Sequence, residues 1–196
     1  MNPEEIKARH QVGFSTLFKG YPYRKLKKGV LISLMTSTLF VFLIIVFGCD
    51  ARSIILVMIQ DAIAIMPNLI GFVLAGYAII VGFGNKEFLL SASEPGKNGL
   101  SLYQTYSYIY SFSLITLIAT LFCAFVFRLI SLVCYSPASV CLVKFLNISG
   151  LFILVFLIIQ SLASLLYMVI NVFNLAQAHH LKLTIERLMA EQDEKK

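Results

Sequence analysis

Charged residues are scarce in this chain of 196 amino acids, and their scarcity excludes an ordinary soluble domain. Asp, Glu, Lys and Arg together make up 13% of the sequence, whereas typical soluble proteins contain about 25%. Hydrophobic residues reach 59%, and the mean hydropathy is +0.85. The composition therefore predicts a protein that resides in lipid.

Signatures of catalysis and of metal binding are also missing. The sequence contains no Gly-x-Ser-x-Gly elbow, no His-Glu-x-x-His zinc motif, no Walker loop and no dinucleotide fingerprint. The four cysteines match no zinc-ligand spacing. His179 and His180 are adjacent, so on a helix they point about 100° apart and cannot easily share one metal. We therefore expect no catalytic residue, no cofactor and no metal, and a function other than that of an enzyme.

What the chain does contain is four long apolar runs, over residues 29–48, 54–84, 107–135 and 142–175. Each is long enough to cross a hydrocarbon core of roughly 30 Å. The first lacks an Ala-x-Ala-like cleavage site, so we expect an anchor and not a signal peptide. The prediction is an all-α polytopic membrane protein. A transmembrane domain of four helices, residues 29–178, lies between an N-terminal arm, 1–28, and a C-terminal tail, 179–196.

The basic residues predict the orientation of these spans. Four spans place both termini on one side, which receives thirteen Lys and Arg residues, whereas the other side receives only Arg52 and Lys144. Because Lys and Arg concentrate in cytoplasmic loops, we expect both termini in the cytoplasm. The net charge of +6 is then explained by topology and anionic lipid, and we expect no direct contact with nucleic acid.

The N-terminal arm ends in a basic cluster beside the first span, made up of Arg24, Lys25, Lys27 and Lys28. Each basic residue at an anionic leaflet contributes roughly 1 kcal/mol of attraction, so the cluster is a candidate site for lipid headgroups. An ordinary basic flank of a first span is the alternative.

Four tyrosines lie just before or at the start of the third span: Tyr103, Tyr106, Tyr108 and Tyr110. Their position predicts an interfacial belt of aromatic rings. A docking or gating surface is the alternative.

The second span carries Pro67 followed by Asn68. Proline removes a helix hydrogen bond, so we expect a kink or break near Met66. Small residues then recur on one helix face, at Gly71, Ala75, Ala78 and Gly82. Such stripes allow close contact between helices in lipid, here within the chain or between subunits. A smooth pore-lining face, gated at the proline, is the alternative.

Two charged residues lie inside the spans. Asp61 in the second and Arg128 in the third fall at similar predicted depths, and an opposite charge offsets much of the cost of burying each one in lipid. We therefore predict an intramembrane ion pair, with separate snorkelling or hydration as the alternative. Uncharged polar residues accompany them, at Gln60, Asn68, Gln160, Asn171 and Asn174. These join helices or line a hydrated path.

Cys134 and Cys141 flank the short loop between the third and fourth spans. If that side is oxidising, they are positioned for a disulfide. The alternative is that both are small apolar residues that face neighbouring helices.

The last apolar run continues from Leu151 to Gln192 without glycine or proline. It predicts one helix on the order of 60 Å long, which leaves the membrane for the cytoplasm. In the tail, Leu181, Ile185 and Leu188 fall on one face. An exposed apolar stripe needs a surface to bury it, so we predict docking of a soluble protein or self-association there. A tail lying along the membrane is the alternative.

One segment carries a resemblance to known proteins. It runs from Pro67 through Asn68, Leu69, Ile70, Gly71 and Phe72 to Gly76, Tyr77, Ala78, Gly82, Phe83 and Phe88. This segment resembles part of small bacterial membrane proteins from uncharacterised or anti-phage defence neighbourhoods. The plan of four spans with a cytoplasmic tail is similar to that of the membrane subunit of the Kiwa defence system. The resemblance implies a sensor or scaffold in the bacterial inner membrane that forms a homo-oligomer, recruits a cytoplasmic DNA-binding protein and blocks phage replication.

Two hypotheses follow for the function. In the first, the protein is a membrane scaffold whose cytoplasmic surfaces hold a soluble effector. In the second, it is a small oligomeric ion channel or pore-forming effector, gated at Pro67 and lined by Asn68 or by the pair of Asp61 and Arg128.

Overall fold

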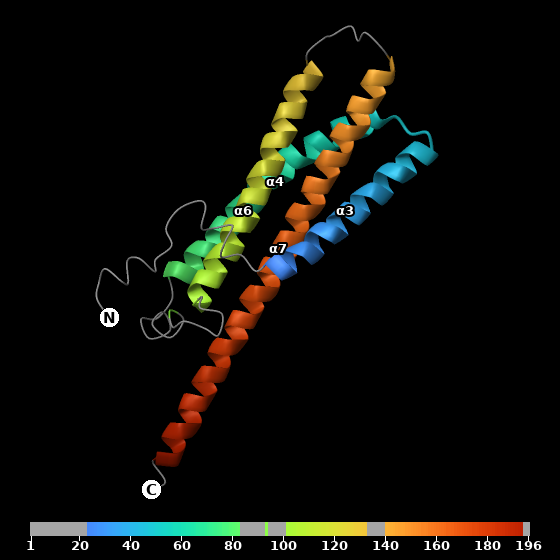
Figure 1. The fold of residues 1–196 in the computed structure, drawn as a ribbon. Coiled ribbons are helices and arrows are strands. Elements are labelled where there is room, and N and C mark those ends of the chain that lie inside the picture. Colours follow the sequence, from blue (N-terminus) through green and yellow to red (C-terminus); the bar gives the residue numbers. More distant parts are fainter. Residues whose placement is uncertain (1–22, 83–92, 94–100, 133–139, 194–196) are drawn as a thin grey trace, which may run out of the picture.

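The computed structural model describes residues 23–82, 93, 101–132 and 140–193 of the chain. Nearly all of them belong to four helices: α3 (Tyr23–Val46), α4 (Ala51–Gly82), α6 (Leu102–Leu132) and α7 (Val140–Asp193) (Figure 1). Each is long and apolar enough to cross a membrane. Within the described residues, the prediction of an all-α chain with four helices able to cross a membrane is therefore confirmed, with helices that begin two to six residues before the apolar runs.

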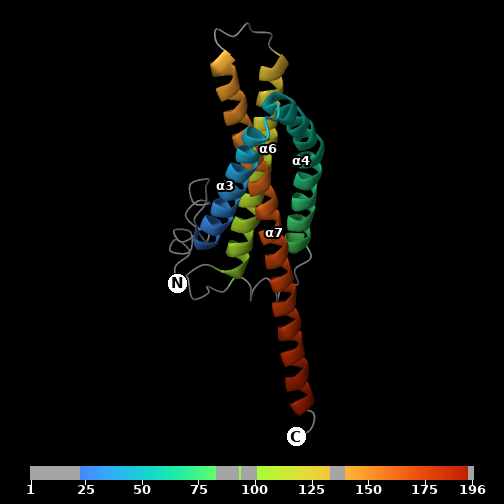
Figure 2. The same ribbon diagram turned by 90° about the vertical axis from the view of Figure 1, so that its right-hand side faces the viewer.

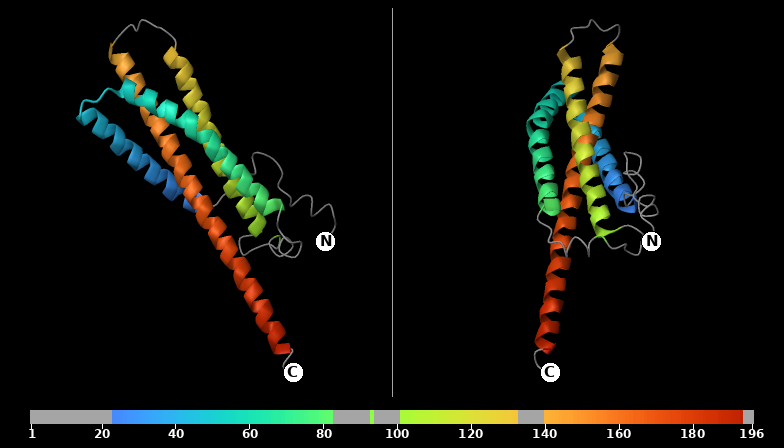
Figure 3. Two further views of the ribbon diagram at one scale, coloured as in Figure 1. Left: turned by 180° about the vertical axis from the view of Figure 1, so that it is seen from behind. Right: turned by 90° about the vertical axis from the view of Figure 1, so that its left-hand side faces the viewer.

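The helix α7 is the centre of the arrangement, since it packs against α3, α4 and α6. The helices α4 and α6 also pack against each other. Figures 2 and 3 show α3 and α4 on opposite sides of α7. The bundle therefore has two parts, a three-helix core of α4, α6 and α7 and a single helix, α3, laid against α7.

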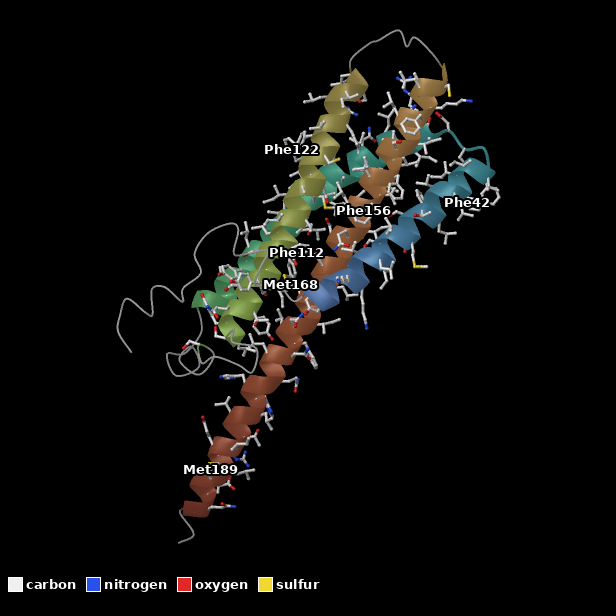
Figure 4. The ribbon with its side chains drawn as sticks, viewed as in Figure 1. Phe42, Phe112, Phe122, Phe156, Met168 and Met189 are labelled. Atoms are coloured by element: carbon white, nitrogen blue, oxygen red, sulfur yellow. The ribbon has the colours of Figure 1, made fainter. Side chains whose placement is uncertain are left out.

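Two clusters of buried side chains hold these parts together. The larger includes Ile59 and Met66 from α4, Leu117 from α6 and Leu154 from α7. The smaller joins α3 to α7 through a separate set: Val41, Ile44, Leu151 and Val155. Many large apolar side chains point outward instead, as Phe42 and Phe122 do in Figure 4. An apolar exterior is what lipid requires, because lipid tails are as apolar as the core.

The helix α4 passes through Pro67 without a break. It curves along its length, as Figure 2 shows. The side-chain amide of Asn68 donates to the backbone oxygen of Ala64 at 3.3 Å, one turn earlier. Transmembrane helices commonly tolerate proline, because neighbouring helices and polar side chains satisfy the backbone groups that it frees. Of the kink or break predicted near Met66, the structure shows a bend and no break.

Local sequence signals set the turn between α3 and α4. The backbone N–H groups of Gly48 and Cys49 donate to the oxygens of Ile45 and Ile44 at 3.2 and 3.0 Å, and Gly48 has a φ of 64°. This is a Schellman motif, which ends a helix with a left-handed residue that glycine adopts at little cost. The chain then reverses at once into α4.

Asp50 caps the first turn of α4. Its carboxylate accepts hydrogen bonds from the Ser53 hydroxyl at 2.6 Å and from the N–H groups of Arg52 and Ser53 at 3.2 Å each. These bonds, the Ser53 hydroxyl foremost, hold the pKa of Asp50 below its ordinary 3.8 because they stabilise the charged form. A reciprocal capping box begins α6, where Ser101 and Gln104 exchange hydrogen bonds at 3.0 and 3.1 Å.

Candidate functional site

A column of hydroxyl groups joins α6 to α7 inside the bundle. The hydroxyl oxygens of Thr120 and Ser161 lie 2.7 Å apart, and those of Thr116 and Ser164 lie 3.1 Å apart. Ser113 donates to the backbone oxygen of Ser164 at 3.2 Å. Sequence reasoning missed this column, although its members recur every three or four residues on one face of each helix. Hydrogen bonds of this kind between transmembrane helices contribute about 0.6 kcal/mol each.

One of the polar side chains considered for a hydrated path, that of Gln160, also joins two helices. The Ser33 hydroxyl of α3 donates to the side-chain oxygen of Gln160 in α7 at 3.0 Å. The Tyr106 hydroxyl donates to the backbone oxygen of Asn171 at 2.7 Å. Among the described residues, every buried side-chain nitrogen or oxygen atom has a hydrogen-bond partner. Gln160 therefore links two helices, whereas the side-chain amide of Asn171 donates to the Tyr167 oxygen within α7 at 2.6 Å.

The tyrosines at the start of α6 pack inward and not only along an interface. Tyr106 and Tyr110 are buried, and the rings of Tyr77 and Tyr110 lie 5.5 Å apart between centroids. Gly76 provides the room, because a β-carbon there would lie 3.4 Å from the Tyr110 hydroxyl oxygen. The glycine of α4 at the contact with α6 is thus Gly76, which lies outside the predicted stripe.

The predicted stripe of small residues lies on the outside of the bundle. Gly71, Ala75 and Ala78 are exposed, and a β-carbon on Gly71 would have no atom within 4 Å; the exposure of Gly82 is outside the described part of the chain. Val73, two residues after Gly71, is buried, and two residues turn a helix by about 200°. The stripe therefore does not pack against another helix of the same chain, and contact between subunits remains a prediction.

The expected pairing of Asp61 with Arg128 is not present in the structure. Asp61 is exposed and Arg128 half-buried, and the ion pair recorded among the described residues joins Arg187 to Glu191 instead. The reason is the direction in which the Asp61 side chain points. Asp61 comes two positions after the buried Ile59, and two residues turn a helix by about 200°, so Asp61 faces away from the core.

The position of Asp61 makes its exposure costly. It lies ten residues into α4, or about 15 Å from the helix start; if the hydrocarbon core of roughly 30 Å begins at that start, Asp61 is near its middle. An aspartate at the centre of a span that faces lipid costs about 2.5 to 3.5 kcal/mol on insertion scales. A single copy of the chain leaves this cost unrelieved.

The last part of α7 extends beyond the bundle. From Phe173 onward its described side chains are exposed, apart from the half-buried Leu175 and His179, and Figure 1 shows this segment leading away from the other helices. The apolar stripe predicted for the tail lies in this segment. Its three side chains are exposed to different extents: Leu181 61%, Ile185 43% and Leu188 51%. None of the three belongs to the buried clusters of the bundle.

The remaining predicted positions are distributed as follows. Lys27 and Lys28 are exposed at the start of α3, whereas the side chains of Arg24 and Lys25 lie outside the described part. Cys141 is an exposed free cysteine, and Cys134 lies outside the described residues. Within the part of the chain that the structure describes, no three His, Cys, Asp or Glu side chains are arranged to hold a metal ion.

No protein-family model matches this chain, and no curated protein or solved structure matches it either. These comparisons do not link the chain to the Kiwa system, and the resemblance stays a prediction from the sequence.

Proposed function

We propose that this protein is a membrane-embedded sensor or scaffold that assembles with itself and uses the end of α7 to hold a soluble protein. The observation that carries the proposal is the extension of α7, whose apolar stripe is exposed along a helix that leaves the bundle. The 21 residues from Phe173 to Asp193 form a rod about 30 Å long.

Such a rod needs a partner for two physical reasons. A helix gains most of its stability from burial of an apolar face, and Leu181, Ile185 and Leu188 are exposed. The other faces carry the exposed Leu183 and Met189 together with charged side chains, including the ion pair between Arg187 and Glu191 at 3.0 Å. We expect a soluble protein to cover the apolar stripe and to leave the charged faces in solvent.

The direction of the extension favours a soluble partner over the membrane surface. The helix α7 continues from its span to Asp193 as one element, and it stays nearly straight in Figures 1 and 2. A segment that lay along the membrane would have to turn sharply where it leaves the bilayer. A straight continuation presents the stripe away from lipid.

The biological setting of the proposal comes from the sequence. The excess of Lys and Arg on one side supports cytoplasmic termini in a bacterial inner membrane. The resemblance to the Kiwa membrane subunit supports a role in anti-phage defence, with a DNA-binding protein as the soluble effector. On this proposal the membrane subunit itself contacts no nucleic acid and catalyses no reaction.

A second candidate function is a small oligomeric channel or pore. It is favoured by the polar side chains on the outside of α4, where Gln60, Asp61 and Asn68 are exposed. If several copies placed these faces around a common axis, they would line an aqueous path. The substitution Asn68→Leu would then change ion flux through liposomes that contain the purified protein, whereas a scaffold would conduct nothing before or after the change.

The proposed function is tested by purification of the intact chain from native membranes in mild detergent. The variant Leu188→Glu places a charge on the stripe, and Leu183→Glu places the same charge elsewhere on the same helix, five positions back. Both leucines are 51% exposed, so the two changes disturb the fold alike. We expect a soluble protein to co-purify stoichiometrically with wild type and with Leu183→Glu, and to be lost with Leu188→Glu. Equal recovery with both variants would show that the stripe is not the docking site.

A further inference from the structure

Two arginines lie on facing sides of α4 and α6, at the end of the bundle where α3 turns into α4. On α6, Arg128 comes eighteen residues after Tyr110, which is five helical turns, so the two share one face. Tyr110 contacts Gly76 and Tyr77 of α4. Arg128, which is half-buried, therefore lies on the face of α6 that packs against α4.

Arg52 occupies the corresponding face of α4. It comes seven residues before the buried Ile59 and twenty-five before Tyr77, and both separations are within about 20° of a whole number of turns. The Tyr77 ring packs on Tyr110 of α6, with 5.5 Å between centroids. Arg52 thus lies on the side of α4 that faces α6, and it is exposed because α4 begins only one residue earlier, at Ala51.

The two arginines also lie at nearly the same height in the bundle. Gly150 of α7 marks a common level, because a β-carbon there would lie 3.2 Å from Ile55 of α4 and 3.8 Å from the Phe127 ring of α6. Arg52 lies three residues before Ile55, and Arg128 lies one residue after Phe127. Since α4 and α6 run in opposite directions, both arginines lie on the same side of this level, about 4.5 and 1.5 Å beyond it.

No acidic side chain balances this pair of charges. Among the described residues, no ion pair includes Arg52 or Arg128, and residues 101–185 contain no Asp or Glu. The carboxylate of Asp50 accepts the three hydrogen bonds of the α4 cap, and Asp61 faces away from the core. Two guanidinium groups on facing sides of packed helices repel each other, and each brings five N–H donors. An anion bound between them relieves the repulsion and uses the donors.

The surroundings of Arg128 indicate where this anion comes from. The helix α6 continues past Arg128 to its end with large exposed apolar side chains: Leu129, Ile130 and Leu132. These side chains suit acyl chains, so lipid still surrounds the helix at this height. Phosphate is the anion of the adjoining headgroup layer, and arginine binds it with two parallel hydrogen bonds. Basic pockets between transmembrane helices bind lipid headgroups in this way.

We infer that Arg52 and Arg128 form a binding site for the phosphate group of an anionic phospholipid, in the leaflet at the α3–α4 turn. The site lies between the ends of α4 and α6, and the acyl chains lie along the apolar surface of α6 beside it. This inference goes beyond the proposed function and does not depend on it, because the proposed docking stripe is at the opposite end of α7.

The inference is tested by titration of the full chain, delipidated in mild detergent, with dioleoyl phosphatidylglycerol, and bound lipid is counted by native mass spectrometry. We expect wild type to bind one lipid more tightly than any further ones. Arg128→Gln and Arg52→Gln should each raise the Kd for that lipid about tenfold or more, the loss expected when a hydrogen bond to a charged group is removed. A Kd unchanged in both variants would overturn the site. Because Arg52 is exposed, Arg52→Gln keeps the test valid even if Arg128→Gln disturbs the packing.

Lys144 provides the matched control. It carries the same charge at the same end of the bundle and is exposed. It comes seven residues before Leu151, on the face of α7 that packs against Val41 and Ile44 of α3, and not between α4 and α6. We expect Lys144→Gln to bind the lipid as wild type does. An equal loss in Lys144→Gln would show attraction to the overall charge of this end and would overturn a site made by the two arginines.

Two further probes separate the phosphate of a lipid from other ligands. Dioleoylglycerol has the same acyl chains without the phosphate, and inorganic phosphate has no acyl chains. We expect neither to displace the bound phosphatidylglycerol when it is added at the same concentration. Displacement by dioleoylglycerol would show a site for acyl chains alone, and displacement by inorganic phosphate would show a site for a free anion. Either result would overturn the inference.

Discussion

The close packing of α4, α6 and α7 at Gly150 can be tested by replacing this glycine with a larger residue. Gly150 is buried, and a β-carbon added to it would lie 3.2 Å from the terminal carbon of Ile55 and 3.8 Å from the Phe127 ring. The remaining atoms of a leucine side chain would extend further toward Ile55 and Phe127 than this β-carbon does. The substitution Gly150→Leu must therefore push α4 or α6 away from α7.

The expected loss of stability is the difference between two terms. Overpacking of a close-packed interior costs about 1 to 3 kcal/mol, whereas replacing a glycine inside a helix gains roughly 0.8 kcal/mol. We expect Gly150→Leu to lower the free energy of unfolding by about 0.2 to 2.2 kcal/mol. The measurement is an unfolding titration with SDS in mixed micelles, followed by loss of helical circular dichroism.

Two alanine substitutions provide the controls. In Gly150→Ala the new methyl group meets the flexible end of Ile55, which can turn aside, so its cost roughly cancels the gain in helix propensity. In Gly71→Ala nothing opposes the methyl group, and we expect a stabilisation of about 0.5 to 1 kcal/mol. If Gly150→Leu unfolds at the same SDS fraction as wild type, the three helices do not meet at Gly150 and the packing described above is refuted.

Three further outcomes follow from the contacts. Replacing Thr120 and Ser161 by alanine, singly and together, is expected to show a coupling of about 0.6 kcal/mol in SDS unfolding, and additive single effects would mean that the hydroxyl column is not a direct bond. Tyr106→Phe removes the bond to the Asn171 oxygen and is expected to cost a similar amount, whereas Tyr108→Phe serves as the matched control. The pKa of Asp50 lies below 3.8 in the folded chain, so its cap stabilises α4 above about pH 4 and is lost as the pH falls through the folded pKa. The protection factors of the first-turn amides of α4, which correct for the intrinsic pH dependence of exchange, should then fall in acid in wild type, whereas an Asp50→Ala protein should show low protection both above and below the folded pKa.

Much of the architecture could be predicted because it depends on local properties of the sequence. The four spans follow from apolar length, since only a helix satisfies its own backbone in lipid. The continuity of α7 to Asp193 follows from the absence of glycine and proline after Leu151. A disturbance of α4 follows from Pro67, and the structure shows that the helix continues through it.

The direction in which side chains point could not be predicted in the same way. The small residues Gly71, Ala75 and Ala78 predict close helix contact within the chain or between subunits, yet within the chain α4 packs through a different face and places Gly76 against Tyr110. The depths of Asp61 and Arg128 were read from span lengths, and depth alone does not bring two side chains together.

By itself, therefore, the sequence determined that the chain is helical, that four of its segments can cross a membrane and that its last helix runs on past the bundle. The tertiary structure alone decided which face of each helix is buried: it turned the hydroxyls of α6 and α7 inward and Asp61 outward. The physical reason is the solvent. In water, alternation of polar and apolar residues marks the buried face of a helix, whereas in lipid both faces are apolar and only the contacts between helices distinguish them.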